Sequence, residues 1–280
     1  MKVVSLKKQT KADTTRGEKV GNMGKENKIL LLSLCMLSLG VRPLFPALET
    51  RNQLLFYFDK IEVKGDLDVF IKKGQKRGKV SIYADSEIMD SVTANVRQKT
   101  LFLDANNSYE FKRRIPFVKL NATRKFPVEI MVYVEEIAEV RILESSNLSC
   151  SNISSSHLKV LHSSTGDVHL ESVNTPKIEV LHLGTGRLSL QGEQTSELEI
   201  EVRGNGVVDA GELEVSNAKV VHYGKGELQI NPEQWLDARL LSSGSIFLHQ
   251  NPTNSVVEVK GTGQIKKLFE PQVNPGNSKE

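Results

Sequence analysis

The sequence has little cysteine and few aromatic residues, and both shortages limit the class of protein. Only two of the 280 residues are cysteines, Cys35 and Cys150, and aromatic residues make up 6%. Cys35 lies in an apolar run near the N-terminus, so the chain beyond that run has a single thiol and cannot form an intramolecular disulfide. Val, Leu and Ile are left to fill the interior, which is typical of β-rich proteins.

The chain also lacks a large excess of one charge. The formal net charge is +3, but the first 40 residues contain eight basic and three acidic residues. The rest of the chain contains 29 basic and 31 acidic residues, a net charge of −2. Proteins that bind nucleic acid through its phosphates carry a basic excess, so we expect no nucleic-acid partner.

Long apolar segments are missing as well. The longest, 29–40, is shorter than the ~20 residues of a membrane-spanning helix. Lys25 and Lys28 precede it, and Ser38 and Gly40 stand at −3 and −1 of a cut after Gly40, as in a secretory signal peptide. The mature chain would then contain no transmembrane span.

We therefore expect residues 1–40 to be a leader, with Met1 or Met23 as its start, followed by a linker at 41–53. A buried N-terminal helix is one alternative, and a lipid anchor at Cys35 is another.

The sequence does contain an internal repeat. From Ser146 onward a small residue recurs at steps of 20, 20, 20, 20, 18 and 19 residues. It is Gly166, Gly186, Gly206, Gly226, Gly244 and Gly263 in the six later repeats. A phosphate-binding loop leads into a helix and occurs once, whereas these glycines precede strand-like sequence each time. We interpret them as corners that need a positive φ or a close approach between neighbouring turns of the chain.

Apolar residues alternate with polar ones twice in each repeat, which predicts two short strands per repeat with one buried face. Stacking such coils buries a continuous core, so residues 144–268 are predicted to form a parallel β-solenoid with coils of about 20 residues. Residues 54–143 alternate without the glycines and should continue and cap the N-terminal end. Within this part, 85–96 is predicted to be a short helix or a loop, and 269–280 a disordered tail.

The residues carry a resemblance to a known family. The stretches FDKIEVKGDLDVFIKKG and FPVEIMVYVEEIAEVRI and the string GTGRL, GNGVV, GKGEL, GTGQI resemble the putative auto-transporter adhesin, head-GIN domain family of bacterial envelope proteins, over roughly 55–267. The family's repeats usually contain Gly-Ser-Gly, and here Thr, Asn or Lys takes the middle place. The resemblance implies a right-handed parallel β-helix, related in shape to pectin-lyase-like folds, with no recognised catalytic residues and a proposed role in adhesion.

Three histidines share one repeat position. The alternation places them facing inward, just before the corner: they are His162, His182 and His222, and Val202 takes this position in the repeat between the last two. Two imidazoles on adjacent coils could share a zinc or copper ion. The alternative is a stacked ladder whose ring nitrogens bond to corner backbone groups. No carboxylate or thiol joins the column, so we favour the ladder and expect no cofactor.

Enzymatic chemistry has no clear support in the sequence. A glycan lyase or hydrolase on this fold needs clustered carboxylates or bases on one outer face. The expected outward column mixes both signs, which indicates a solvated face with pairs between coils. Its members are Glu179, Glu199, Lys219, Arg239 and Glu258. We expect no catalytic residues and no enzyme.

A basic segment, 111–125, interrupts the alternation and is predicted to be a long surface loop. Its basic residues are Lys112, Arg113, Arg114, Lys119, Arg124 and Lys125. They could contact acidic polysaccharide or lipid head groups, or simply be solvated. Trp235 and Tyr223 could line a sugar platform or serve in packing.

These patterns favour a secreted or cell-envelope β-solenoid that acts as a non-catalytic surface or adhesion module. Its location would be the periplasm, the outer membrane or the cell surface of a bacterium, and its partner an envelope protein or a surface polysaccharide. The alternatives are a periplasmic structural or regulatory domain that binds another envelope protein, and a carbohydrate-active enzyme on a pectin-lyase-like β-helix.

Overall fold

The computed structural model describes residues 47–74, 78–115 and 118–268, with the backbone alone at 108–124. These residues belong to one compact unit, Pro46–Glu280. The expected leader, residues 41–46 of the expected linker and the expected tail lie outside the described residues. In the described part, no helix has the length and apolar character needed to cross a membrane.

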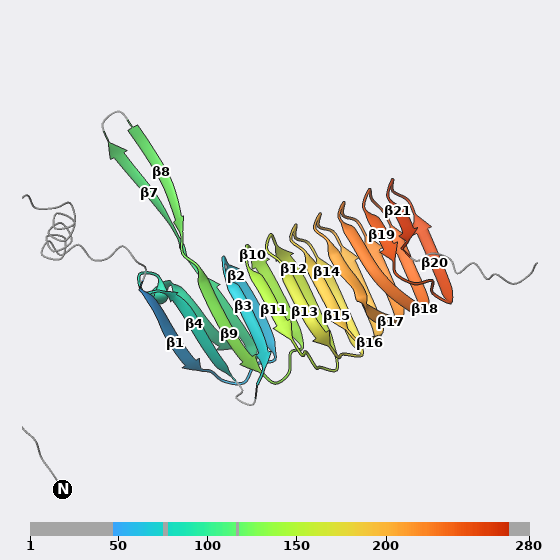
Figure 1. Ribbon diagram of the computed structural model, residues 1–280, viewed down its shortest axis with the longest axis horizontal. Helices are drawn as coiled ribbons and strands as arrows, with labels where there is room; N and C mark the ends of the chain where they lie inside the picture. The colour runs from blue at the N-terminus through green and yellow to red at the C-terminus, as the bar shows by residue number, and fades with distance from the viewer. Residues whose placement is uncertain (1–46, 75–77, 116–117, 269–280) are drawn as a thin grey trace, which may run out of the picture. The chain divides into compact units, whose positions relative to one another are not determined.

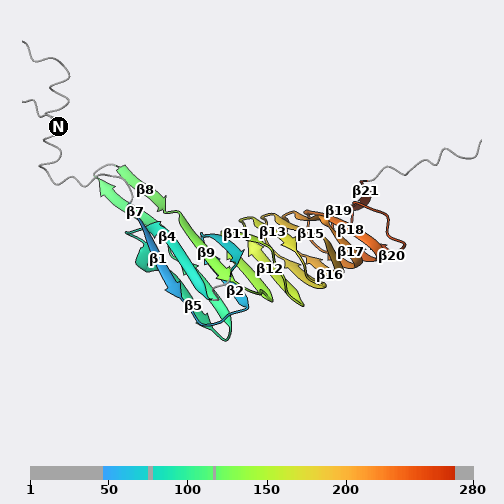
Figure 2. The ribbon, with the colours of Figure 1, turned by 60° about the horizontal axis from the view of Figure 1, so that its bottom comes forward.

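Two sheets face each other along the solenoid (Figures 1 and 2). The β10 sheet contains, in spatial order, β5 (Val92–Arg97), β6 (Thr100–Ala105), β2 (Lys60–Gly65), β10 (Glu139–Glu144), β12 (Leu158–Ser164), β14 (Lys177–His182), β16 (Gln194–Val202), β17 (Val208–His222), β18 (Glu227–Leu240) and β20 (Asn254–Val259). The β11 sheet contains β1 (Leu48–Leu54), β4 (Lys79–Asp85), β9 (Val128–Val134), β3 (Asp68–Lys73), β11 (Asn147–Ser151), β13 (Val168–Val173), β15 (Leu188–Gly192), the first parts of β17 and β18, β19 (Ser245–Leu248) and β21 (Gln264–Lys267). From β10 onward the strands of each sheet are parallel, so the predicted β-solenoid of about 20 residues per coil is confirmed.

The core lies between the two sheets and consists of the inward residues of the strands between the two ends of the solenoid. Val160, Val180, Ile200 and Val220 lie in register on successive coils, and each is at most 4% exposed. Burial of such a side chain contributes about 1.5–3 kcal/mol. The fold is therefore held by many similar contributions.

The corner glycines lie in single file, and close approach is the reason for them. A Cβ atom on Gly186 would lie 1.9 Å from the carbonyl oxygen of Gly166, and one on Gly226 would lie 1.8 Å from that of Gly206. Among the described glycines only Gly65 and Gly78 have a positive φ. The corners therefore need glycine because the next coil's backbone passes where a side chain would begin.

The N-terminal part enters the solenoid out of sequence order. β2 lies between β6 and β10, and β3 lies between β9 and β11, so the coil made of β6 and β9 precedes the β2–β3 coil in space although it follows it in the chain. At this end three antiparallel pairs follow: β1 with β4, β4 with β9, and β5 with β6. Ile88 and Met89 are buried there, beside a short 3₁₀ helix at Met89–Ser91.

Three local expectations are corrected. Residues 48–53, placed in the linker, form most of β1, because their backbone pairs with β4. The 85–96 segment is neither a single helix nor a loop, since one 3₁₀ turn leads into β5. The basic segment expected to be a loop forms most of an antiparallel hairpin, β7 (Ser108–Ile115) with β8 (Val118–Lys125).

Candidate functional site

A shallow groove of about 430 Å³ runs across the outer face of the β10 sheet, from β10 to β17. Two columns of outward residues line it, one residue from each coil. The first column is Glu139, Lys159, Glu179, Glu199 and Lys219. The second is Arg141, Leu161, Leu181, Glu201 and Val221. We call this surface the outer groove.

The register corrects the outward column expected from the sequence. Lys219 lies beside Asp237, while Arg239 lies beside Val221 and Glu258 beside Arg239. The step from Lys219 to its neighbour Asp237 is two residues shorter than the usual 20, because the register between β17 and β18 shifts after Ala210. Counting in steps of 20 therefore placed Arg239 and Glu258 in the wrong column.

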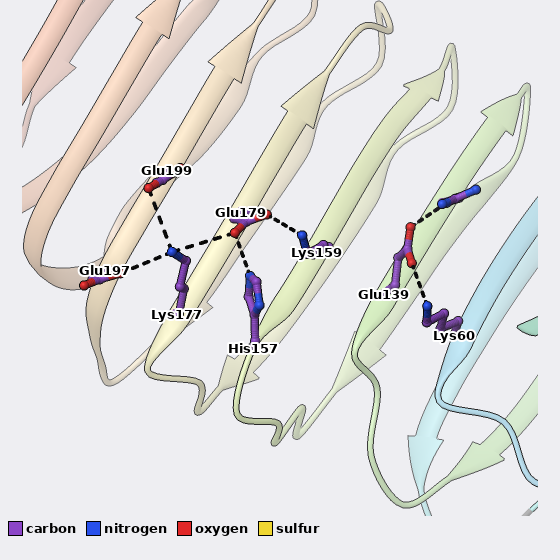
Figure 3. Close-up of polar contacts among 9 residues, drawn as sticks. Lys60, Glu139, His157, Lys159, Lys177, Glu179, Glu197 and Glu199 are labelled. Atoms are coloured by element: carbon purple, nitrogen blue, oxygen red, sulfur yellow. Dashed lines mark hydrogen bonds and ion pairs between the residues drawn. The ribbon is translucent and has the colours of Figure 1, made fainter. Parts of the chain in front are cut away.

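Ion pairs link neighbouring coils at the edge of the outer groove (Figure 3). The carboxylate of Glu179 forms an ion pair with Lys159 at 2.9 Å and lies 2.9 Å from Nε2 of His157. Lys177 lies within 3.9 Å of carboxylate oxygens of both Glu197 and Glu199. These partners come from three successive coils, so the pairs hold the charged side chains in fixed positions.

A second cluster lies at the first coils of the outer groove. Arg141 contacts Glu139 at 2.6 Å and Glu62 at 3.6 Å, and Lys60 contacts Glu139 at 3.6 Å (Figure 3). Exposed pairs of this kind contribute little to stability individually. Their main effect here is to set the pattern of charge on the surface.

The pKa directions in the outer groove follow from these pairs. The hydrogen bond from Lys159, together with the charges of His157 and Lys177, holds the pKa of the Glu179 carboxyl below its ordinary value. The hydrogen bond to Glu197 raises the pKa of Lys177. A general acid needs a carboxyl with a raised pKa, so Glu179 is suited to pairing with a cation and not to donating a proton.

The apolar centre of the outer groove was missed by the sequence reasoning. Leu161, Leu181 and Val221 face outward and are half-buried. The sequence did contain a signal for them, because an apolar residue occupies this outward position of the alternation in three of the repeats. Such a stripe, flanked by charges, can contact an apolar part of a ligand while the charged column binds its polar groups.

The three histidines form the ladder that the sequence favoured. His162, His182 and His222 are fully buried, and the Nε2–H of each donates to the carbonyl oxygen of Gly166, Gly186 or Gly226, at 2.9–3.1 Å. His162 and His182 lie side by side with ring centroids 4.8 Å apart, whereas Val202 separates His222 from them.

The remaining ring nitrogens of the ladder face an apolar interior. The Nδ1 atoms of all three histidines are buried without a hydrogen-bond partner. Burial lowers the pKa of each ring, to about 4 for His162, where the neighbouring His182 adds to the effect. Among the described residues no group of three or more His, Cys, Asp and Glu side chains could hold a metal ion.

Other candidate residues do not assemble into a site. Trp235 lies beside Asn217, its partner in the neighbouring strand. Asn217 precedes Tyr223 by six residues on the same outer face, so the two aromatic residues are roughly 20 Å apart along the strand. They therefore do not form one sugar platform. The thiol of Cys150 is buried, and burial raises its pKa to about 12, so it is unreactive at neutral pH.

The pairing of β7 with β8 places most residues of the basic segment opposite a residue of the other strand. Arg114 lies opposite Lys119, and Lys112 opposite Asn121. At the base of the hairpin, Lys125 forms an ion pair with Asp66 at 2.6 Å, and the side chain of Asn107 donates to the carbonyl oxygens of Asp66 and Phe126. The proposed anionic contact at Lys112, Arg113, Arg114, Lys119, Arg124 and Lys125 stays a prediction.

Comparison with known protein families identifies the chain. Residues 57–252 match the family model described as putative auto-transporter adhesin, head GIN domain. The chain belongs to this family. The resemblance inferred from the glycine repeat and the two strand-rich stretches is therefore confirmed.

Solved structures of the same fold include proteins from Bacteroides fragilis and Parabacteroides distasonis. A putative adhesin from Bacteroides fragilis NCTC 9343 is 21% identical, with a TM-score of 0.69 over 79% of this chain and 97% of that one. A putative adhesin and a putative lipid binding protein, both from Parabacteroides distasonis ATCC 8503, are 16% and 18% identical, with TM-scores of 0.54 and 0.55. They cover 80% and 79% of this chain and 98% and 97% of their own. The search of curated proteins found no match.

Proposed function

We propose that this head-GIN-family protein is an exported, non-catalytic module of the bacterial cell envelope that attaches to a surface polymer through the outer groove. The observation that carries the proposal is the groove itself, in which the outward apolar residues Leu161, Leu181 and Val221 lie beside a column of charged side chains. Its residues recur at the strand spacing of about 4.8 Å, so an extended polymer lying along the solenoid would meet similar contacts at each step.

Adhesion is the role that relatives suggest. The family is described as putative auto-transporter adhesin, and structures of the same fold from two bacteria are described as putative adhesins. Adhesion requires export, which agrees with the signal-peptide pattern at 29–40. A surface polysaccharide or another envelope protein is the partner that fits this role.

The charges in the outer groove favour binding over catalysis. Its acidic side chains pair with lysine, arginine or histidine, and the pKa of Glu179 is lowered. A glycoside hydrolase requires one carboxyl with a raised pKa beside a second carboxylate. Incubation of the purified protein with acidic polysaccharides should therefore release no reducing ends, and release of products would favour the enzyme instead.

Replacing Leu181 and Leu161 by aspartate should abolish ligand binding by the outer groove. The change places two uncompensated carboxylates in the apolar stripe, and loss of a central contact of this kind weakens binding at least about tenfold. The measurement is a glycan array and a binding assay on envelope fractions, compared with wild type.

The matched control lies on the opposite face of the solenoid. Ser149 and Ser189 are half-buried outward residues of the β11 sheet, so S149D/S189D adds the same charge away from the outer groove. This variant should bind as wild type does. Equal loss in both variants, or none in either, would remove the outer groove as the binding surface.

We also propose that the basic hairpin contacts anionic surfaces. Each Lys or Arg near an anionic membrane contributes about 1 kcal/mol, so replacing Lys112, Arg113 and Arg114 by Gln should weaken binding to phosphatidylglycerol-containing vesicles by roughly 100-fold. Co-sedimentation with these vesicles at low salt measures it. The control replaces Arg141, Lys159 and Lys219 of the outer groove by Gln in the same way. Unchanged vesicle binding by the hairpin variant would refute the contact.

A further inference from the structure

The last coil of the solenoid has two free strand edges. Among the described strands, β20 pairs only with β18 and β21 only with β19, whereas β12, β14 and β16 have neighbours on both sides. A free edge presents a row of backbone N–H and C=O groups that can pair with another strand. Here the two edges belong to the two sheets of one coil, so any cover must bring two strands at once.

The solenoid interior is exposed at this end. Val257 and Val259 occupy inward positions, stacked on Ala238 and Leu240, which are fully buried. The two valines are nevertheless 47% and 48% exposed. Ile265, stacked on Ile246, is also only half-buried, so the inward residues of both strands lack cover.

The opposite end also has two described strands paired on one side only, β1 and β5, but its inward residues are covered. There β1, β4 and β5 pair antiparallel, and the inward residues Ala84, Ile88 and Val92 are buried. A second molecule therefore cannot stack its first coil on this last coil in the way that successive coils stack. Endless head-to-tail growth is excluded for the same reason.

Residues 275–278 lack the Val, Leu and Ile found at most inward positions of the coils. One step of 19 residues beyond Val256, Val257 and Val259 come Pro275, Gly276 and Ser278. Proline has no N–H to donate to β20, and glycine and serine bring no apolar side chain to cover the valines. Cover has to come from a surface with two strand edges and inward apolar residues, and the same end of a second copy is such a surface.

We propose that two copies of this chain associate through their last coils to form a two-fold symmetric dimer. The two-fold axis reverses the strand direction, so each β20 pairs antiparallel with β20 of the other copy, and each β21 with β21. Val257, Val259 and Ile265 of both copies then form one continuous core. The only acidic residue of β20, Glu258, is already paired with Lys260 at 2.5 Å, so it does not oppose the association.

Sedimentation equilibrium of the purified protein tests the dimer. Wild type should show twice the monomer mass at about 100 µM and dissociate on dilution. V257K/V259K should be monomeric at the same concentration, with the circular dichroism and melting temperature of the wild-type monomer. L54K, which changes an exposed leucine at the other end, is the control and should dimerise as wild type does.

Hydrogen exchange gives a second measurement that does not depend on a variant. The amides of β20 and β21 should exchange more slowly as protein concentration rises, while those of β1 should not change. A monomeric wild type at about 100 µM would overturn the proposal, as would a V257K/V259K variant that still dimerises. A dimer that appears only after removal of 269–280 would assign the cover to that segment and also overturn it.

Discussion

Gly226→Ala should destabilise the protein by roughly 3–5 kcal/mol or prevent it from folding. The added Cβ would lie 1.8 Å from the carbonyl oxygen of Gly206, a contact with backbone that no side-chain rotation can relieve. The backbone of one coil would have to move away from the next, which weakens the hydrogen bonds and packing on both sides. Urea unfolding followed by circular dichroism measures the change in the free energy of unfolding.

The control is a glycine outside the corner file. A Cβ on Gly74 would meet the side chain of Tyr133 at 3.2 Å, and this ring can shift. Gly74→Ala should therefore change the free energy of unfolding by less than about 1 kcal/mol. If Gly226→Ala unfolded at the same urea concentration as Gly74→Ala, close packing of the corners would not be what requires glycine.

Lowering the pH from 6.5 towards 4 should destabilise the fold through the histidine ladder. The pKa of each ladder histidine is lowered in the folded state, so the unfolded chain binds more protons in this range. The stabilisation is complete above the unfolded pKa of about 6.5 and is lost as the pH falls towards about 4, the folded pKa of His162. The loss is at most about 1.4 kcal/mol per pH unit for each histidine.

Thermal unfolding between pH 5 and 7 measures this loss, because most carboxylates stay ionised there. The register supplies a matched variant, since the same column contains Ile142, Val202 and Leu240. Replacing His162, His182 and His222 by leucine should flatten the pH dependence in this range. An equally steep dependence in the triple variant would show that other groups cause it.

The repeat alone was enough to predict much of the fold. Period-two alternation and a small residue every 18–20 residues are local signals, and both survive in the structure as strands and stacked corners. They also predicted which residues face inward, including the histidine column. Whether the corners need glycine for a positive φ or for close approach between coils, however, only the tertiary structure could decide.

The candidate site was predicted less well. The sequence indicated a charged outward face, but it could not place the residues beyond Lys219, because β18 has two residues fewer between Ile230 and Trp235 than β17 has between Ala210 and Asn217, and the parity of the alternation does not change. The outward apolar residues Leu161, Leu181 and Val221 were readable from parity, yet only the register put Leu161 beside Leu181 and placed Glu201 between Leu181 and Val221.

The sequence by itself determined that the chain folds into stacked two-stranded coils, because alternation and corner size are properties of residues close together in the chain. Only the tertiary structure decided the order of the first coils, the closed and open ends, and the β7–β8 hairpin. The order of the first coils depends on which strands pair across 40 residues, as β2 does with β6, and the hairpin depends on the local pairing of β7 with β8. Pairing at long range depends on the burial of whole faces, which no short stretch of sequence specifies.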